Sequence, residues 1–222
     1  MINSFVKKIC FHPHIQEFIK LSEETLKANG YTNHGLTHCQ FVAERAQKLA
    51  QDLKLSKREQ ELSYIAGYCH DMGNFLNRKL HHLLGALLFY DLFKNKIKVK
   101  DLMTIVQAIA FHDKKEMNFI NPVSAILVIA DKSDVRRERV YKTSLELIKK
   151  DIHDRVNYAT YSSQLKTDPQ RKEITLLLKI DTNFVSLIEY FEIFTQRMIY
   201  CRKAAKYLNC QFHLIINDIK FI

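Results

Sequence analysis

The spacing of apolar residues predicts helices over most of residues 1–150. Apolar positions that recur every three or four residues place one face of a helix in a core. Three such stretches run from Val42 to Leu53, from Leu62 to Cys69 and from Leu102 to Ile109. A fourth, from Pro122 to Asp131, is apolar almost throughout and predicts a fully buried helix that opens at its proline.

The last third of the chain has a different period. Apolar and polar residues alternate from Ile174 to Ile180 and again from Phe212 to Ile216, which is typical of strands with one buried face. Helical spacing returns between them, from Phe184 to Leu208. A weaker strand is expected from Arg155 to Leu165, ahead of the turn signal that includes Pro169.

These patterns predict a mainly α protein in two parts. A helical domain is expected over residues 1–150 and a small β-β-α-β unit over residues 151–222. We see no catalytic constellation in the second part. Its many Phe and Ile residues are expected to cover the helical domain or to form the interface of a homodimer, and we favour the homodimer.

Composition narrows the possible partners and the location. The formal net charge of +10 attracts anions, including nucleotides and nucleic acid. A basic motif interleaved with aromatic residues is missing, so nucleic acid is not the expected partner. No apolar run approaches the ~18 residues that a membrane span requires. The five cysteines form no Cys-x-x-Cys pair, which predicts reduced thiols and a cytoplasmic location.

Histidine and aspartate residues stand where the predicted helices point into the core. The adjacent pair His70-Asp71 closes one buried helix, and His38 and Asp131 each lie four residues from an apolar position on an inward face. A carboxylate in an apolar setting needs a cation or strong hydrogen-bond donors. Two His and two Asp suit Mn, Fe or Zn better than Ca or Mg.

Two more histidines fit a second divalent cation. His81 precedes one predicted helix and His112 ends another. With Asp71 as a bridging carboxylate, they would hold a second ion, so one or two metal ions are expected. His82 is an alternative to His81, because a shift by one residue would put it in the same place in the pattern.

The order of these residues resembles the HD-domain superfamily of metal-dependent phosphohydrolases. The six matched positions are His38, His70, Asp71, His81, His112 and Asp131. The resemblance covers about residues 30 to 140 and implies an all-helical domain that hydrolyses phosphoester bonds, mostly of nucleotides, with bound metal. His81 and His112 resemble the bimetallic branches. Neighbouring segments resemble an HD subgroup with a C-terminal β-containing extension.

The chain also departs from those branches. Asn74 stands where several of them carry Lys, Asp113 follows His112 where they carry a second His, and no Gly-Tyr-Pro triplet is present. Cleavage of cyclic dinucleotides is therefore not expected. Asn74 also favours an alternative function, a non-catalytic or weakly catalytic module that senses a metal-bound nucleotide.

A phosphate substrate needs donors close to the metal. The candidates are close in sequence to the predicted ligands: His34, Arg78, Lys132, Arg136 and Arg137. Asn74 is predicted to hold a leaving oxygen, and Asp71 and Arg78 to take part in catalysis. For Arg136 and Arg137, a role in salt bridges is an equal alternative.

The sequence as a whole predicts a hydrolase of a phosphoester or phosphoanhydride bond in a nucleotide or a related phosphorylated small molecule. A hydroxide activated by the metal would be the nucleophile.

Overall fold

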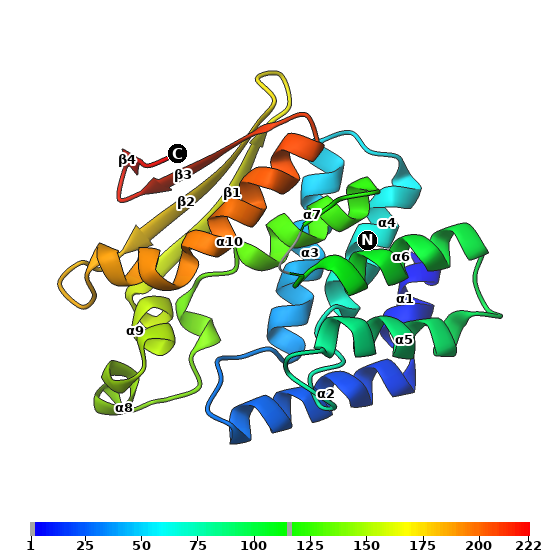
Figure 1. Cartoon of the computed structure of the whole chain (residues 1–222), viewed down its shortest axis with the longest axis horizontal. Helices are drawn as coiled ribbons and strands as arrows, with labels where there is room; N and C mark the ends of the chain where they lie inside the picture. The colour runs from blue at the N-terminus through cyan, green and yellow to red at the C-terminus, as the bar shows by residue number, and fades with distance from the viewer. Residues whose placement is uncertain (1–2, 115–116) are drawn as a thin grey trace. The chain divides into compact units, whose positions relative to one another are not determined.

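The computed structural model describes residues 3–114 and 117–222, and the chain divides after Asp131 into a helical unit and a second unit (Figure 1). The change of period in the sequence places the division near residue 150. The structure places it earlier because the 3₁₀ turn Arg137–Arg139 contacts the short helix α9 (Ile152–Ala159), which in turn contacts the first strand and the long helix of the second unit.

Helices make up the helical unit. They are α1 (Ser4–Cys10), α2 (Pro13–Ala28), α3 (Leu36–Asp52), α4 (Lys57–Cys69), α5 (His81–Phe93), α6 (Val99–Phe111) and α7 (Pro122–Lys132), whose last residue begins the second unit. Helix α3 packs along α4, α5 pairs with α6, and α4 also contacts α6. Helix α7 is buried from Val123 to Ala130, as its apolar sequence predicts.

Local sequence signals set where α4 begins. The Ser56 hydroxyl accepts a hydrogen bond from the Glu59 backbone N–H at 3.2 Å, and the Glu59 carboxylate accepts one from the Ser56 N–H at 2.9 Å. This reciprocal pair satisfies two N–H groups that a helix start leaves without partners. The helix then runs to Cys69, which places His70 and Asp71 at its buried end.

The second unit combines short helices with a sheet. Its elements are a 3₁₀ turn (Arg137–Arg139), α8 (Leu145–Lys150), α9, β1 (Thr160–Asp168), β2 (Glu173–Ile180), α10 (Leu187–Tyr207), β3 (Gln211–Ile216) and β4 (Ile219–Lys220). The strand order is β1-β2-β3-β4. The pairs β1–β2 and β3–β4 are antiparallel, whereas β2 and β3 are parallel and joined through α10 (Figure 1).

Alternating burial along β2 and β3 explains why α10 contacts the sheet. Leu176 is in register with Leu214, and Leu178 with Ile216, and all four side chains are buried. Successive residues of a strand point to opposite faces, so these positions form one apolar face. Helix α10 contacts β3 and buries Phe194 and other apolar side chains of its own inner face. The predicted β-β-α-β order is confirmed.

One sequence expectation for this unit is wrong. The weak strand predicted from Arg155 to Leu165 begins only at Thr160, because residues 152–159 form α9. The Asp151 side chain caps that helix by accepting hydrogen bonds from two backbone N–H groups. Among the described residues, no helix is long and apolar enough to cross a membrane. The homodimer stays a prediction.

Candidate metal centre

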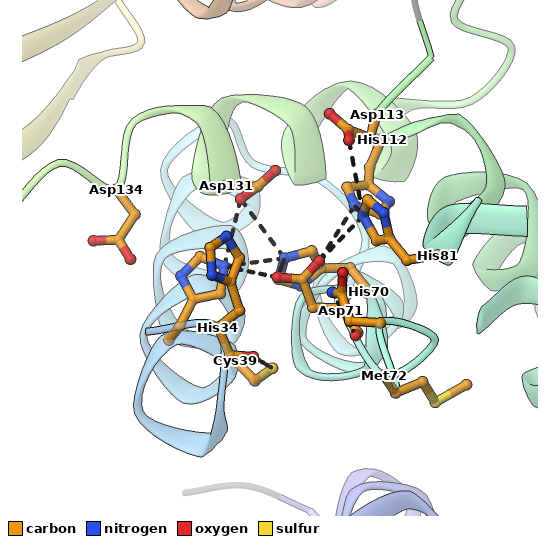
Figure 2. A network of polar contacts seen from close by, with 12 residues as sticks. His34, Cys39, His70, Asp71, Met72, His81, His112, Asp113, Asp131 and Asp134 are labelled. Carbon is orange, nitrogen blue, oxygen red and sulfur yellow. Dashed lines mark hydrogen bonds and ion pairs between the residues drawn. The ribbon is translucent and has the colours of Figure 1, made fainter. Parts of the chain in front are cut away.

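Six buried side chains of the helical unit converge on one place, and Figure 2 labels all of them except His38. They are His38 in the first turn of α3, His70 and Asp71 at the end of α4, His81 at the start of α5, His112 at the end of α6, and Asp131 near the end of α7. These are the six residues predicted as ligands, and their donor atoms form overlapping groups that could hold a metal ion. We refer to the six as the metal centre.

The two carboxylate oxygens of Asp71 face two different pairs of histidines. Oδ2 lies 3.5 Å from Nε2 of His38 and 3.4 Å from Nε2 of His70. Oδ1 lies 3.2 Å from Nε2 of His81 and 3.8 Å from Nε2 of His112. A carboxylate placed in this way can bridge two cations, one on each side.

The centre therefore contains two potential cation positions that share Asp71. The first position is formed by His38, His70, Asp71 and Asp131, whose Oδ1 lies 3.5 Å and 3.6 Å from the two ring nitrogens. The second position is formed by Asp71, His81 and His112.

The histidine rings are oriented so that lone pairs face the centre. In His70, His81 and His112, Nδ1 lies 2.7–2.8 Å from the backbone carbonyl oxygen of the residue three positions earlier. A carbonyl oxygen only accepts, so Nδ1 carries the proton and donates it. In each neutral ring Nε2 is then a bare acceptor, which is the tautomer that a metal ligand requires.

These acceptors are too close to one another to be stable without a positive charge between them. Nε2 of His81 lies 3.1 Å from Nε2 of His112, and the same distance separates the Nε2 atoms of His38 and His70. Two ligands of one ion, each ~2.1 Å from it, can be at most ~4.2 Å apart. Every His–Asp and His–His distance given above for either position is shorter than this. The donor set therefore fits divalent metal ions.

Without metal, the centre holds a proton instead. Burial disfavours the charged form of His70, but the Asp71 carboxylate and hydrogen bonds to Asp131 and Asp71 outweigh burial and raise the pKa of His70 to about 10. Burial would raise the pKa of Asp71, but the charge of His70 and hydrogen bonds from the surrounding histidines lower it well below its usual range. A metal ion must displace this proton to bind.

The geometry favours His81 over His82 as a ligand. The described partners of the Asp71 carboxylate include His81 and not His82. The ring of His82 lies beside the centre, with its centroid 5.5 Å from that of His81 and 6.3 Å from that of His112. His81 is therefore the residue that belongs to the second position.

Arg78 is connected to the centre through Asn74 and His34. Its Nη1 donates to Oδ1 of Asn74 at 2.9 Å, and its Nη2 lies 3.5 Å from Nε2 of His34, whose ring neighbours that of His38. The Nδ2 of Asn74 donates to the Asp71 backbone carbonyl at 2.8 Å. The Asn74 amide is buried and bonded at both ends, so it orients Arg78. Its role at a leaving oxygen stays a prediction.

The other predicted phosphate-binding residues belong to the second unit. Nε of Arg136 pairs with Oδ1 of Asp134 at 2.6 Å, and Nε of Arg137 donates to the Tyr158 carbonyl at 2.7 Å. The Arg136 contact is a salt bridge of the kind that the alternative expects, whereas the Arg137 contact is a hydrogen bond to a backbone carbonyl. Phosphate binding by Lys132, Arg136 and Arg137 stays a prediction.

One carboxylate beside the centre was not assigned to it from the sequence. Oδ2 of Asp113 lies 3.9 Å from Nε2 of His81 (Figure 2). The sequence does contain a signal for it, because His112-Asp113 is a second His-Asp pair that follows a helix, as His70-Asp71 does.

A mainly helical unit with buried His and Asp side chains arranged for divalent metal ions defines the class of this protein. The family model of the HD domain matches residues 35–173, which is more than half of the chain, and the protein belongs to the HD-domain family. HD domains bind divalent metals, in agreement with the donor groups described above.

A curated relative comes from an archaeon. The chain is similar to the uncharacterized protein MJ1020 of Methanocaldococcus jannaschii, with 26% identity over 164 residues. The similar region covers 63% of this chain and 62% of the relative, so this chain matches less than two thirds of the relative's length.

Proposed function

We propose that this HD-domain protein is a metal-dependent phosphohydrolase that cleaves a phosphoester or phosphoanhydride bond of a nucleotide or a related small molecule. The observation that carries the proposal is the position of Asp71 between two pairs of histidines. A shared carboxylate supports two cations held close together, as in many phosphatases and nucleases. Membership of the HD-domain family supports the same reaction class.

The chain supplies the binding groups around that chemistry. When bound, divalent cations polarise phosphoryl oxygens and lower the pKa of water. Arg78 brings a guanidinium whose fork of N–H donors matches phosphoryl oxygens. Asn74 fixes its orientation, and the neighbouring His34 ring offers a second polar group on the His38 side of the centre.

The charge of the chain favours an anionic substrate. With a net charge of +10, the protein attracts phosphorylated molecules over neutral ones. Lys132, Arg136 and Arg137, which follow Asp131 in the sequence, are further candidates for phosphate binding.

Turnover by the reloaded protein tests the proposal. The full chain would be stripped with a chelator, reloaded with Mn²⁺, Fe²⁺ or Zn²⁺, and given nucleoside mono-, di- and triphosphates, dinucleotide polyphosphates and an aryl phosphodiester. We expect phosphate or nucleotide release from at least one class, lost in Asp71→Ala and retained in Asp91→Asn. Asp91 is a matched control because its exposed carboxylate pairs only with Lys94 in the described structure.

The role of Arg78 has a separate test. Arg78→Ala should lower kcat/KM by about 10- to 100-fold with the bound metal unchanged, because a charged donor to the phosphoryl group is lost. An unchanged kcat/KM would refute the phosphate-binding role of Arg78. A chain that holds its metal and binds nucleotide, but turns over no substrate of the panel, would refute the hydrolase and support the sensor alternative.

A further inference from the structure

The two cation positions differ in the number of protein donors. The first position has four residues, whereas the second has Asp71, His81 and His112. Asp113 lies next to the second position, with Oδ2 3.9 Å from Nε2 of His81. In Figure 2 its carboxylate points toward His81 from the side of His112.

The segment that carries Asp113 repeats the local geometry of the segment that carries Asp71. His70 follows the last residue of α4 with φ −60° and ψ −36°, and His112 follows the last residue of α6 with φ −66° and ψ −22°. Both rings donate from Nδ1 to the carbonyl three residues earlier. In each case the next residue is an aspartate, so two equivalent His-Asp pairs reach the centre from two helix ends.

Taking the proposed metal centre as given, we propose that Asp113 is the fourth protein ligand of the second position. Each cation then has two histidines and two carboxylates, with Asp71 shared. The separation of 3.9 Å from His81 is within the ~4.2 Å limit for two ligands of one ion. Asp113 lies at the solvent-facing edge of the centre, with 39% of its side chain exposed, so its side chain can turn toward a cation in the second position.

This assignment determines how the two positions differ. The first position is closed by buried groups, whereas the second has one ligand at the surface, so the second cation exchanges more readily. A third carboxylate in the centre also raises its negative charge. Carboxylate ligands suit Mn²⁺ better than an imidazole-rich set does, so Mn²⁺ is the appropriate probe.

Counting bound Mn²⁺ tests the assignment without using activity. The chelator-treated full chain is titrated with Mn²⁺, and free Mn²⁺ is measured by its electron paramagnetic resonance signal. We expect two Mn²⁺ per wild-type chain. Asp113→Asn should keep the first at unchanged affinity and bind the second at least about tenfold more weakly, since it has lost a charged ligand. His81→Ala is the reference for loss of the second position and should bind one Mn²⁺. Asp91→Asn should behave as wild type.

The outcomes separate this inference from the proposed centre. If His81→Ala loses one Mn²⁺ and Asp113→Asn binds both as tightly as wild type, Asp113 is not a ligand and the two-position centre stands. If the wild-type chain binds fewer than two, or His81→Ala binds two, the second position itself is wrong and the inference fails with it. Unchanged thermal midpoints of Asp113→Asn and Asp91→Asn would exclude a loss of folding as the cause.

Discussion

Each unit buries an aspartate, and the two aspartates have opposite kinds of partners. In the helical unit, the described partners of the Asp71 carboxylate are four histidine rings. In the second unit, Asp134 pairs with Nε of Arg136 at 2.6 Å and with Nη1 of Arg139 at 3.0 Å. Both carboxylates are almost completely buried, so burial alone does not distinguish them.

The difference lies in which group supplies the positive charge. A guanidinium is always charged, so the chain itself neutralises Asp134. Three of the four histidines around Asp71, His70, His81 and His112, are held as Nε2 acceptors. Acceptors do not neutralise a carboxylate unless a proton or a metal ion joins them. Buried acceptors in excess therefore indicate a binding site, whereas a buried pair that is complete within the chain indicates a structural role.

The largest effect is expected from Asp71→Ala. Asp71 contributes an oxygen to both cation positions, so its loss should remove metal from both. We expect kcat/KM to fall by more than ~100-fold, because loss of a ligand should cost more than the ~10- to 100-fold typical of losing a group that only hydrogen-bonds to a ligand. Elemental analysis and turnover on one substrate measure the two losses. Retention of two ions in Asp71→Ala would show that the carboxylate does not bridge them.

Asp134→Ala should lower the stability of the second unit and leave the metal content unchanged. Removing one partner of a buried ion pair leaves the other charge uncompensated and costs about 3–5 kcal/mol, so the second unit should unfold at lower urea concentration. Metal content should not change. Glu138→Ala is the matched control, because the Glu138 side chain is largely exposed and lies 3.7 Å from Arg136. That variant should lose less than ~1 kcal/mol. A loss of metal in Asp134→Ala would contradict the separation of roles.

The sequence was informative where helix periodicity determines the direction of a side chain. His38 and Asp131 lie on apolar helix faces, and a helix of known period orients them toward the core, so their convergence with His70 and Asp71 was predictable. The same argument does not apply to Arg136, because it lies after α7 in an irregular segment. Its pairing with Asp134 depends on backbone angles that no apolar period encodes.

Two other features could not be read from the apolar period. One is a set of contacts in the irregular segment after α4, and the other is a segment where a helix and a strand compete. The contacts of Asn74 with Arg78 and with the Asp71 carbonyl were not predicted from the sequence, because no apolar period relates the residues of that irregular segment. The start of β1 was placed too early, because the cap at Asp151 makes a short helix from residues whose alternation also suits a strand.

A smaller effect, restricted to the second position, is expected from Gly73→Ala. A Cβ at Gly73 would lie 2.3 Å from the His81 carbonyl oxygen and 2.6 Å from the Gly85 nitrogen, both backbone atoms. The start of α5 must therefore shift, at a cost of about 1–3 kcal/mol. His81 would move with it, so Mn²⁺ titration should show a weaker second position and an unchanged first one.

Gly85→Ala is the matched control for that experiment. A Cβ at Gly85 would have its nearest neighbours at 3.5 Å, which is ordinary van der Waals contact. Stability and both Mn²⁺ affinities should therefore remain close to wild type. Equal effects of the two variants would show that the close contact at Gly73 does not position His81.

The most gradual effect is a dependence of the stability of the helical unit on pH. Without metal, the pKa of His70 is about 10, whereas it is 6.5 in the unfolded chain. The folded state therefore binds the proton more tightly. The stabilisation is fully present below pH 6.5 and is lost as the pH rises through about 10.

Metal binding should reverse this trend, because the cation replaces the proton and the affinity of the site for the cation rises with pH. Urea unfolding of the chelator-treated chain at pH 6, 8 and 10, with and without Mn²⁺, measures both trends. His70→Gln removes the titrating imidazole and should make the metal-free profile less steep between pH 6 and 10. The ion pairs of Asp134 should add no dependence in this range, because arginine keeps its charge throughout it. If the metal-free profile is equally steep in His70→Gln, the titrating group is not His70. The proposed difference between the two buried aspartates, a proton on histidine for Asp71 and arginine for Asp134, would then lose its support.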